Sequence, residues 1–146
     1  MNKTLLFTIG YEGRSAADVM ARLTAEKVRV LIDVRYRPNS RKPGLAKTGL
    51  AKTCEALGIV YVHDRDLGTP PEMLDHVRSG TGYDDDTLVE YRRFLSTKEP
   101  SLEAASARVQ EGPACLLCFE ADASDCHRAV VADVLAQRTG ATVRHL

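Results

Sequence analysis

The segment from position 118 to position 128 carries five side chains with chemical functions that an apolar core does not need. They are Cys118, Glu120, Cys126, His127 and Arg128. Burying a carboxylate, an imidazole or a guanidinium costs free energy unless another group pairs with it. This composition within eleven residues therefore indicates a place where a ligand is held or a bond is attacked.

Cys126 is the first candidate nucleophile. Residues 114–119 are predicted to form a buried strand and a helix is expected to begin near Asp125, so Cys126 would lie where backbone N–H groups are unpaired and the helix dipole is positive. That setting is expected to lower the thiol pKa and to favour bound anions. The alternative is that Cys126 packs as a small apolar group beneath the first helical turn.

The acid–base groups of such a site are expected to be His127, Asp33 and Glu120. Neighbouring residues on a helix do not face each other, so His127 is expected to orient the loop, bind substrate or work with another strand. A histidine hydrogen-bonded to backbone is the alternative. Arg35 shares one side of its strand with Asp33 and can clamp a phosphate or carboxylate. The alternative there is a satisfied Asp33–Arg35 ion pair.

The spacing of the cysteines bears on metal binding. Cys115 and Cys118 are three residues apart, so on a strand they point to opposite faces and form neither a zinc knuckle nor a thioredoxin-type pair. Cys115 is assigned to the core. Cys118 can join Cys126 and His127 in a thiolate metal site, or pair with Cys126 as a redox couple. Both are the less favoured hypotheses, and no metal or cofactor is assigned.

The loop of residues 35–44, called here the basic loop, carries Arg35, Arg37, Arg41 and Lys42, with Lys47 close behind and no acidic residue. The whole chain has 20 basic and 20 acidic residues, so no global field attracts a polyanion and affinity must come from a local patch. We expect the basic loop to contact an anionic small molecule or a nucleic-acid backbone. Aromatic residues make up only 5% of the chain, which leaves few platforms for base stacking.

The elements that position these residues follow from apolar runs at 5–9, 28–34, 59–63, 114–119 and 142–145. Most are continuous, which is typical of strands covered on both faces. Helices are expected from Ser15 and at about 48–57, 86–96, 100–111 and 125–139, with long loops at 36–47 and 64–85. The alternation predicts one α/β domain over residues 1–146, a Rossmann-like, doubly wound, mainly parallel sheet of about five strands with helices on both faces.

Ligands of such sheets bind at the carboxyl ends of the strands. Four of these ends are polar, and we expect them to meet in one crevice. The side chains predicted to bind substrate there are Tyr11, Arg35, Arg37, Arg41, Lys42, His63, Cys118 and Arg128.

Several motifs together resemble the domain of unknown function (DUF) 488 family. They lie at residues 8–15 (TIGYEGRS), 33–35 (DVR), 40–44 (SRKPG), 61–63 (YVH), 67–70 (LGTP), 117–120 (LCFE) and 126–128 (CHR). The resemblance implies a small Rossmann-like α/β domain and assigns no reaction. This chain has Leu45-Ala46 where relatives tend to carry an aromatic residue, which weakens a base-stacking hypothesis.

The composition, 44% apolar and 27% charged, is typical of a globular protein. No secretory signal and no run long enough to span a bilayer is visible, so we expect a cytoplasmic protein without a membrane partner. The residues predict a hydrolase or transferase with a reactive cysteine, acting on a phosphate-bearing substrate such as a nucleotide or nucleic-acid end. The alternative is a non-catalytic nucleotide or nucleic-acid binding module. Oligomeric state is not predicted.

Overall fold

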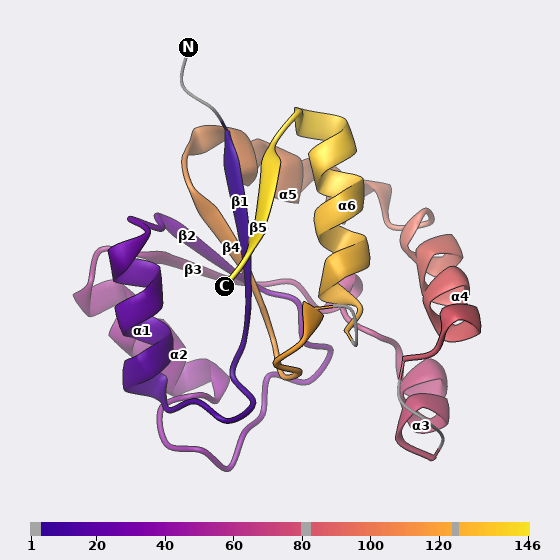
Figure 1. Ribbon diagram of the computed structural model, residues 1–146, viewed down its shortest axis with the longest axis horizontal. Helices are drawn as coiled ribbons and strands as arrows, with labels where there is room; N and C mark the ends of the chain where they lie inside the picture. Colours follow the sequence, from indigo (N-terminus) through magenta and orange to yellow (C-terminus); the bar gives the residue numbers. More distant parts are fainter. Residues whose placement is uncertain (1–3, 80–82, 124–125) are drawn as a thin grey trace.

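The computed structural model describes residues 4–79, 83–123 and 126–146. Its centre is a five-stranded, all-parallel sheet in the order β3-β2-β4-β1-β5 (Figure 1). The strands are β1 (Leu5–Gly10), β2 (Val30–Asp33), β3 (Val60–His63), β4 (Ala114–Cys118) and β5 (Thr142–His145). The predicted Rossmann-like α/β fold is confirmed, and each predicted strand is present.

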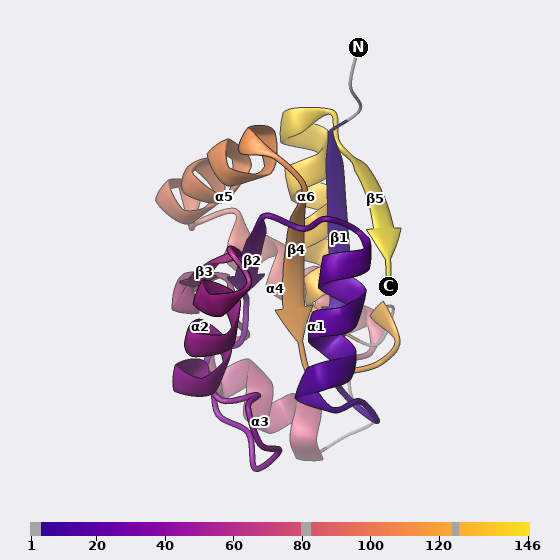
Figure 2. The same ribbon diagram turned by 90° about the vertical axis from the view of Figure 1, so that its left-hand side faces the viewer.

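Helices cover both faces of the sheet (Figures 1 and 2). They are α1 (Ala16–Ala25), α2 (Lys47–Ala56), α3 (Pro71–Ser79), α4 (Asp85–Leu95), α5 (Glu99–Glu111) and α6 (Arg128–Thr139), with a short 3₁₀ helix η1 (Arg65–Leu67). One core cluster joins the sheet to α1 and α2, and the other joins it to α4, α5 and α6. None of the helices within the described residues is long and apolar enough to cross a membrane.

The continuous apolar strands are explained by this two-sided core. On β4, Cys115 and Leu117 belong to the cluster of α1 and α2, whereas Leu116 and Cys118 belong to the cluster of α4, α5 and α6. Alternate side chains of a strand point to opposite faces, so both faces need apolar residues. The prediction that Cys115 is a core residue on the face opposite Cys118 is confirmed.

The start of α1 follows its sequence signal. Ser15 is the N-cap: its hydroxyl accepts from the Asp18 N–H at 3.1 Å, and the Asp18 carboxylate accepts from the Ser15 N–H at 3.1 Å. This reciprocal capping box pairs two backbone donors that the helix leaves free. It directs the chain from the end of β1 into α1, on the face of the sheet that α1 shares with α2.

Two sequence-based expectations are wrong. The long loop at 64–85 contains η1 and α3, and α6 begins at Arg128 rather than near Asp125, a residue outside the described ranges. Cys126 precedes the helix in a turn in which its N–H donates to the Ala123 carbonyl at 3.1 Å, and His127 is the N-cap. The two residues of greatest chemical interest are therefore presented by a turn.

Candidate functional site

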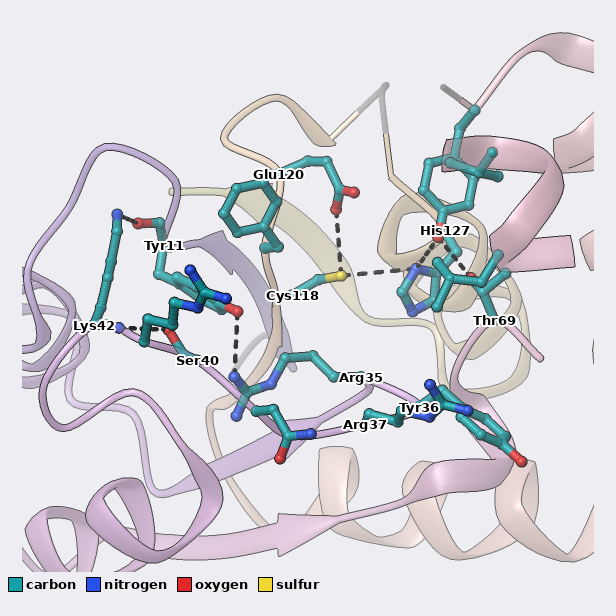
Figure 3. A pocket seen from close by; sticks show the side chains of 16 residues that line it. Tyr11, Arg35, Tyr36, Arg37, Ser40, Lys42, Thr69, Cys118, Glu120 and His127 are labelled. Carbon is teal, nitrogen blue, oxygen red and sulfur yellow. Dashed lines mark hydrogen bonds between the residues drawn. The ribbon is translucent and has the colours of Figure 1, made fainter. Parts of the chain in front are cut away.

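A pocket of about 740 Å³ lies where β1, β2 and β4 end. Four parts of the chain line it: Tyr11 after β1, residues 35–42 after β2, a group between residues 69 and 83 that includes part of α3, and residues 118–120 with His127 (Figure 3). The expected site residues that line it are Tyr11, Arg35, Arg37, Arg41, Lys42, Cys118, Glu120 and His127. Those outside its lining are Asp33, His63, Cys126 and Arg128.

Cys118 ends β4 and puts its thiol in the pocket wall. Its side chain is turned between a carboxylate and an imidazole: the sulfur lies 3.4 Å from Glu120 Oε2 and 3.7 Å from His127 Nδ1 (Figure 3). Two groups that can accept a proton thus flank a thiol that borders on the pocket. A thiol becomes a good nucleophile only when it is deprotonated, so this arrangement can generate one.

The ring of His127 is held in one orientation. Its Nε2 lies 2.7 Å from the Val34 carbonyl, which can only accept, so Nε2 carries a hydrogen and donates. In the neutral ring, Nδ1 is then the free acceptor, and it lies 3.3 Å from the Tyr83 hydroxyl and 3.7 Å from the sulfurs of Cys118 and Cys126. Burial acts to lower the pKa of His127, but Cys126 and the Val34 carbonyl outweigh it and raise this pKa.

The expectation that His127 does not face Cys126 is wrong, because that rule concerns neighbours within a helix and both residues precede α6. The lowered pKa expected for the Cys126 thiol is also wrong. Cys126 is fully buried in a core cluster, and burial raises its pKa well above the usual value, with the contact to Cys118 adding to the shift. The Arg128 N–H does donate to its sulfur at 3.4 Å, but this one contact does not offset desolvation.

Asp33 lies behind Arg35 rather than in the pocket. The two form a bidentate ion pair, with Arg35 Nε 2.8 Å from Oδ1 and Nη2 2.7 Å from Oδ2, and the Tyr61 hydroxyl donates to Oδ2 at 2.6 Å. Arg35 also donates to the Leu45 carbonyl at 2.8 Å and to the Tyr11 hydroxyl at 3.3 Å. Desolvation opposes the charge on Arg35, but Asp33 more than compensates and raises its pKa. A fixed, permanently charged guanidinium results.

Two of the expected substrate ligands contact backbone instead. Arg128 is fully buried, and its guanidinium donates to the carbonyls of Glu120 and of Ala121, the latter at 3.1 Å. His63 Nε2 lies 2.7 Å from the Arg35 carbonyl. Both side chains therefore fix the course of segments that line the pocket, which is support rather than ligand contact.

The cations of the basic loop differ in availability. Lys42 Nζ donates to the carbonyls of Tyr11 at 2.9 Å and Arg14 at 3.2 Å, so it ties this loop to the end of β1. Arg37 and Arg41 are exposed, and neither forms an ion pair with any residue in the described ranges. Arg37 and Arg41 are therefore the exposed charges available to an incoming anion, whereas the charge of Arg35 is already paired with Asp33.

Sequence reasoning placed Thr69 and Tyr83 in a long loop and missed the apolar wall that α3 adds to the pocket. Thr69, Leu74, Val77 and Tyr83 line the pocket from a segment that was expected to be a loop. The sequence does contain a signal for this helix, because Pro71 stands at the first position of α3, where proline favours helix initiation. Leu74 and Val77 then follow at the i, i+3 spacing of one helix face.

The fold and the pocket define a Rossmann-like α/β protein with a buried Cys–His cluster at the carboxyl edge of its sheet. The chain belongs to the family described as domain of unknown function DUF488, whose model matches residues 15–135. No curated protein and no solved structure gives a significant match. The family assigns no reaction, so function is argued from the pocket.

Proposed function

We propose that the protein is a cysteine-dependent hydrolase or transferase that acts on a phosphate-bearing substrate, such as a nucleotide or a nucleic-acid end. The observation that carries the proposal is one pocket with arginines on one wall and a thiol–imidazole pair on the other. The arginines match a phosphate in charge and donor geometry. The thiol lies where an electrophilic atom next to that anion can be reached.

Cys118 replaces Cys126 as the proposed nucleophile. Cys118 and His127 line the pocket, whereas Cys126 does not. His127 Nδ1 takes the Cys118 proton, the thiolate forms a bond to phosphorus, and the bond from phosphorus to the leaving oxygen breaks as His127 returns the proton to that oxygen. Water or an acceptor hydroxyl then releases the phosphoryl group from sulfur.

The other predicted residues take supporting roles in this proposal. Glu120, 3.4 Å from the Cys118 sulfur, orients the thiol. Asp33 positions Arg35 through the bidentate pair, and Arg128 holds the backbone of Glu120. Arg37 and Arg41 attract the anionic substrate, because exposed cations raise the rate at which an anion reaches the pocket and the affinity with which it binds.

Cys118→Ser tests the nucleophile. We expect turnover of a panel of nucleoside mono-, di- and triphosphates to fall to background while the free energy of unfolding stays near that of the parent protein. Cys54→Ala is the matched control, because Cys54 is a fully buried cysteine of the opposite core cluster. Undiminished turnover by Cys118→Ser would refute the assignment.

A second candidate is a non-catalytic binding module for a nucleotide or nucleic acid, which the exposed Arg37 and Arg41 in the pocket lining favour. Affinity would then fall steeply with salt, and Arg37→Ala with Arg41→Ala would weaken binding and flatten that dependence. Cys118→Ser would leave the affinity unchanged. Binding titrations of these variants at two salt concentrations separate the candidates.

A further inference from the structure

The sulfurs of Cys118 and Cys126 and the Nδ1 of His127 all lie within 4.8 Å of one another. Nδ1 is 3.7 Å from each sulfur. In tetrahedral zinc sites with Zn–S of about 2.3 Å and Zn–N of about 2.0–2.1 Å, neighbouring ligand atoms are separated by about 3.6–3.8 Å. Both sulfur–nitrogen separations therefore match neighbouring corners of such a site, and the two sulfurs lie within 4.8 Å of each other.

The orientation of His127 fits the same geometry. A histidine that binds a metal through one nitrogen commonly donates its other N–H to a carboxylate or carbonyl, which fixes the ring. Here Nε2 donates to the Val34 carbonyl at 2.7 Å, which leaves the Nδ1 lone pair directed at the two sulfurs.

Burial and charge also favour a cation. Cys118, Cys126 and His127 are 4%, 0% and 3% exposed. Two buried thiolates without a partner are costly, but two thiolates, a neutral imidazole and a divalent cation sum to zero charge. Thiolate and imidazole are the donor set that selects zinc over magnesium or calcium.

We propose that Cys118, Cys126 and His127 form a binding site for a thiophilic divalent cation, with Zn²⁺ as the best match. Two metal–sulfur bonds and one metal–nitrogen bond form, and the two thiol protons leave to solvent. Because Cys118 and His127 line the pocket, a fourth ligand would come from that side. The side chain of Glu120 lies on that side of Cys118 (Figure 3).

The site has a consequence for the proposed enzyme. A bound cation takes both the Cys118 sulfur and the His127 lone pair, so the nucleophile and its base are blocked together. Zn²⁺ is therefore a reversible inhibitor, an effect that rests on the proposed function, whereas the binding itself does not.

Co²⁺ is the probe for binding, because cobalt thiolates absorb through sulfur-to-metal charge transfer and tetrahedral Co²⁺ has strong visible bands. We expect the reduced full-length protein to bind one Co²⁺ with both features, and Zn²⁺ to abolish them. Cys118→Ser, Cys126→Ser and His127→Ala should each weaken or remove the bands. Cys54→Ala and Cys115→Ala are matched controls that should retain them.

Alkylation and peptide mapping of the parent protein provide a measurement that needs no variant to fold. Zn²⁺ should protect Cys118 and Cys126 under mildly unfolding conditions, while Cys54 and Cys115 react as before. Absence of the cobalt bands, or equal protection of all four thiols, overturns the metal site. If the bands are present but no phosphate ester is turned over by metal-free protein, the metal site stands and the proposed enzyme fails.

Discussion

Asp33→Ala removes the counter-charge of a buried arginine. The Asp33 carboxylate accepts from the Arg35 N–H at 3.2 Å, from Arg35 Nε at 2.8 Å and Nη2 at 2.7 Å, and from the Tyr61 hydroxyl at 2.6 Å. Arg35 is only 5% exposed, so the unpaired charge left by the substitution would be poorly solvated. Breaking a buried pair by removing one partner costs about 3–5 kcal/mol, out of the roughly 5–15 kcal/mol that stabilises a domain.

Urea unfolding followed by circular dichroism measures this loss. The control is Asp133→Ala, because the Arg92–Asp133 pair has a similar N–O distance of 2.9 Å but both side chains are about half exposed, at 49% and 48%. Exposed pairs contribute about 0–1 kcal/mol, so the two variants should differ by about 3 kcal/mol with equal denaturant slopes. A loss for Asp33→Ala no larger than for Asp133→Ala would refute the structural role given to this ion pair. Replacing both partners, as in Asp33→Leu with Arg35→Met, should restore much of the stability.

Two further predictions concern the same edge of the sheet. Gly10→Ala places a Cβ 1.7 Å from the Glu120 carbonyl oxygen, so urea unfolding should show a loss of more than about 3 kcal/mol in the free energy of unfolding. Gly13→Ala is the control: its φ is 75° and its surroundings are open, so it should lose only about 1–2 kcal/mol. Equal losses for the two variants would disprove the close approach at Gly10. The pKa of His145 is lowered from 6.5 by burial and by the charge of Arg128, so the unfolded chain binds this proton more tightly and His145 contributes a loss of stability as pH falls through 6.5. An NMR titration of the His145 ring should give a pKa below 6.5, and a value at or above it would contradict the assignment.

The central strands β1, β2 and β4 were predictable because they are continuous, buried runs, as strands covered by helices on both faces must be. Ser15 and Asp18 likewise carry the start of α1 in a local motif. Helix α3 was missed because the glycine and prolines of the Gly68–Pro71 stretch are typical of a turn or loop. Pro71, however, is also the first residue of the helix, a position that proline favours.

The roles of the thiols could not be predicted from spacing, because desolvation depends on which distant segment covers them. Tyr91 of α4 is fully buried and its ring contacts the His127 ring edge-on at 5.2 Å, so α4 helps to enclose the cluster. No local sequence pattern predicts that α4 packs against this cluster. The helix-terminus argument for Cys126 therefore gave the wrong direction for its pKa, and Cys118, predicted as a ligand contact, is the buried thiol that lines the pocket.

The pocket is assembled from parts that can change independently. Leu74 and Val77 reach it from α3, which packs mainly against α4 and takes no part in the sheet. Arg35 and Cys118, by contrast, lie at the carboxyl ends of the central strands β2 and β4. Exchanging side chains along α3 should therefore reshape one wall of the pocket while the ends of the central strands keep their positions.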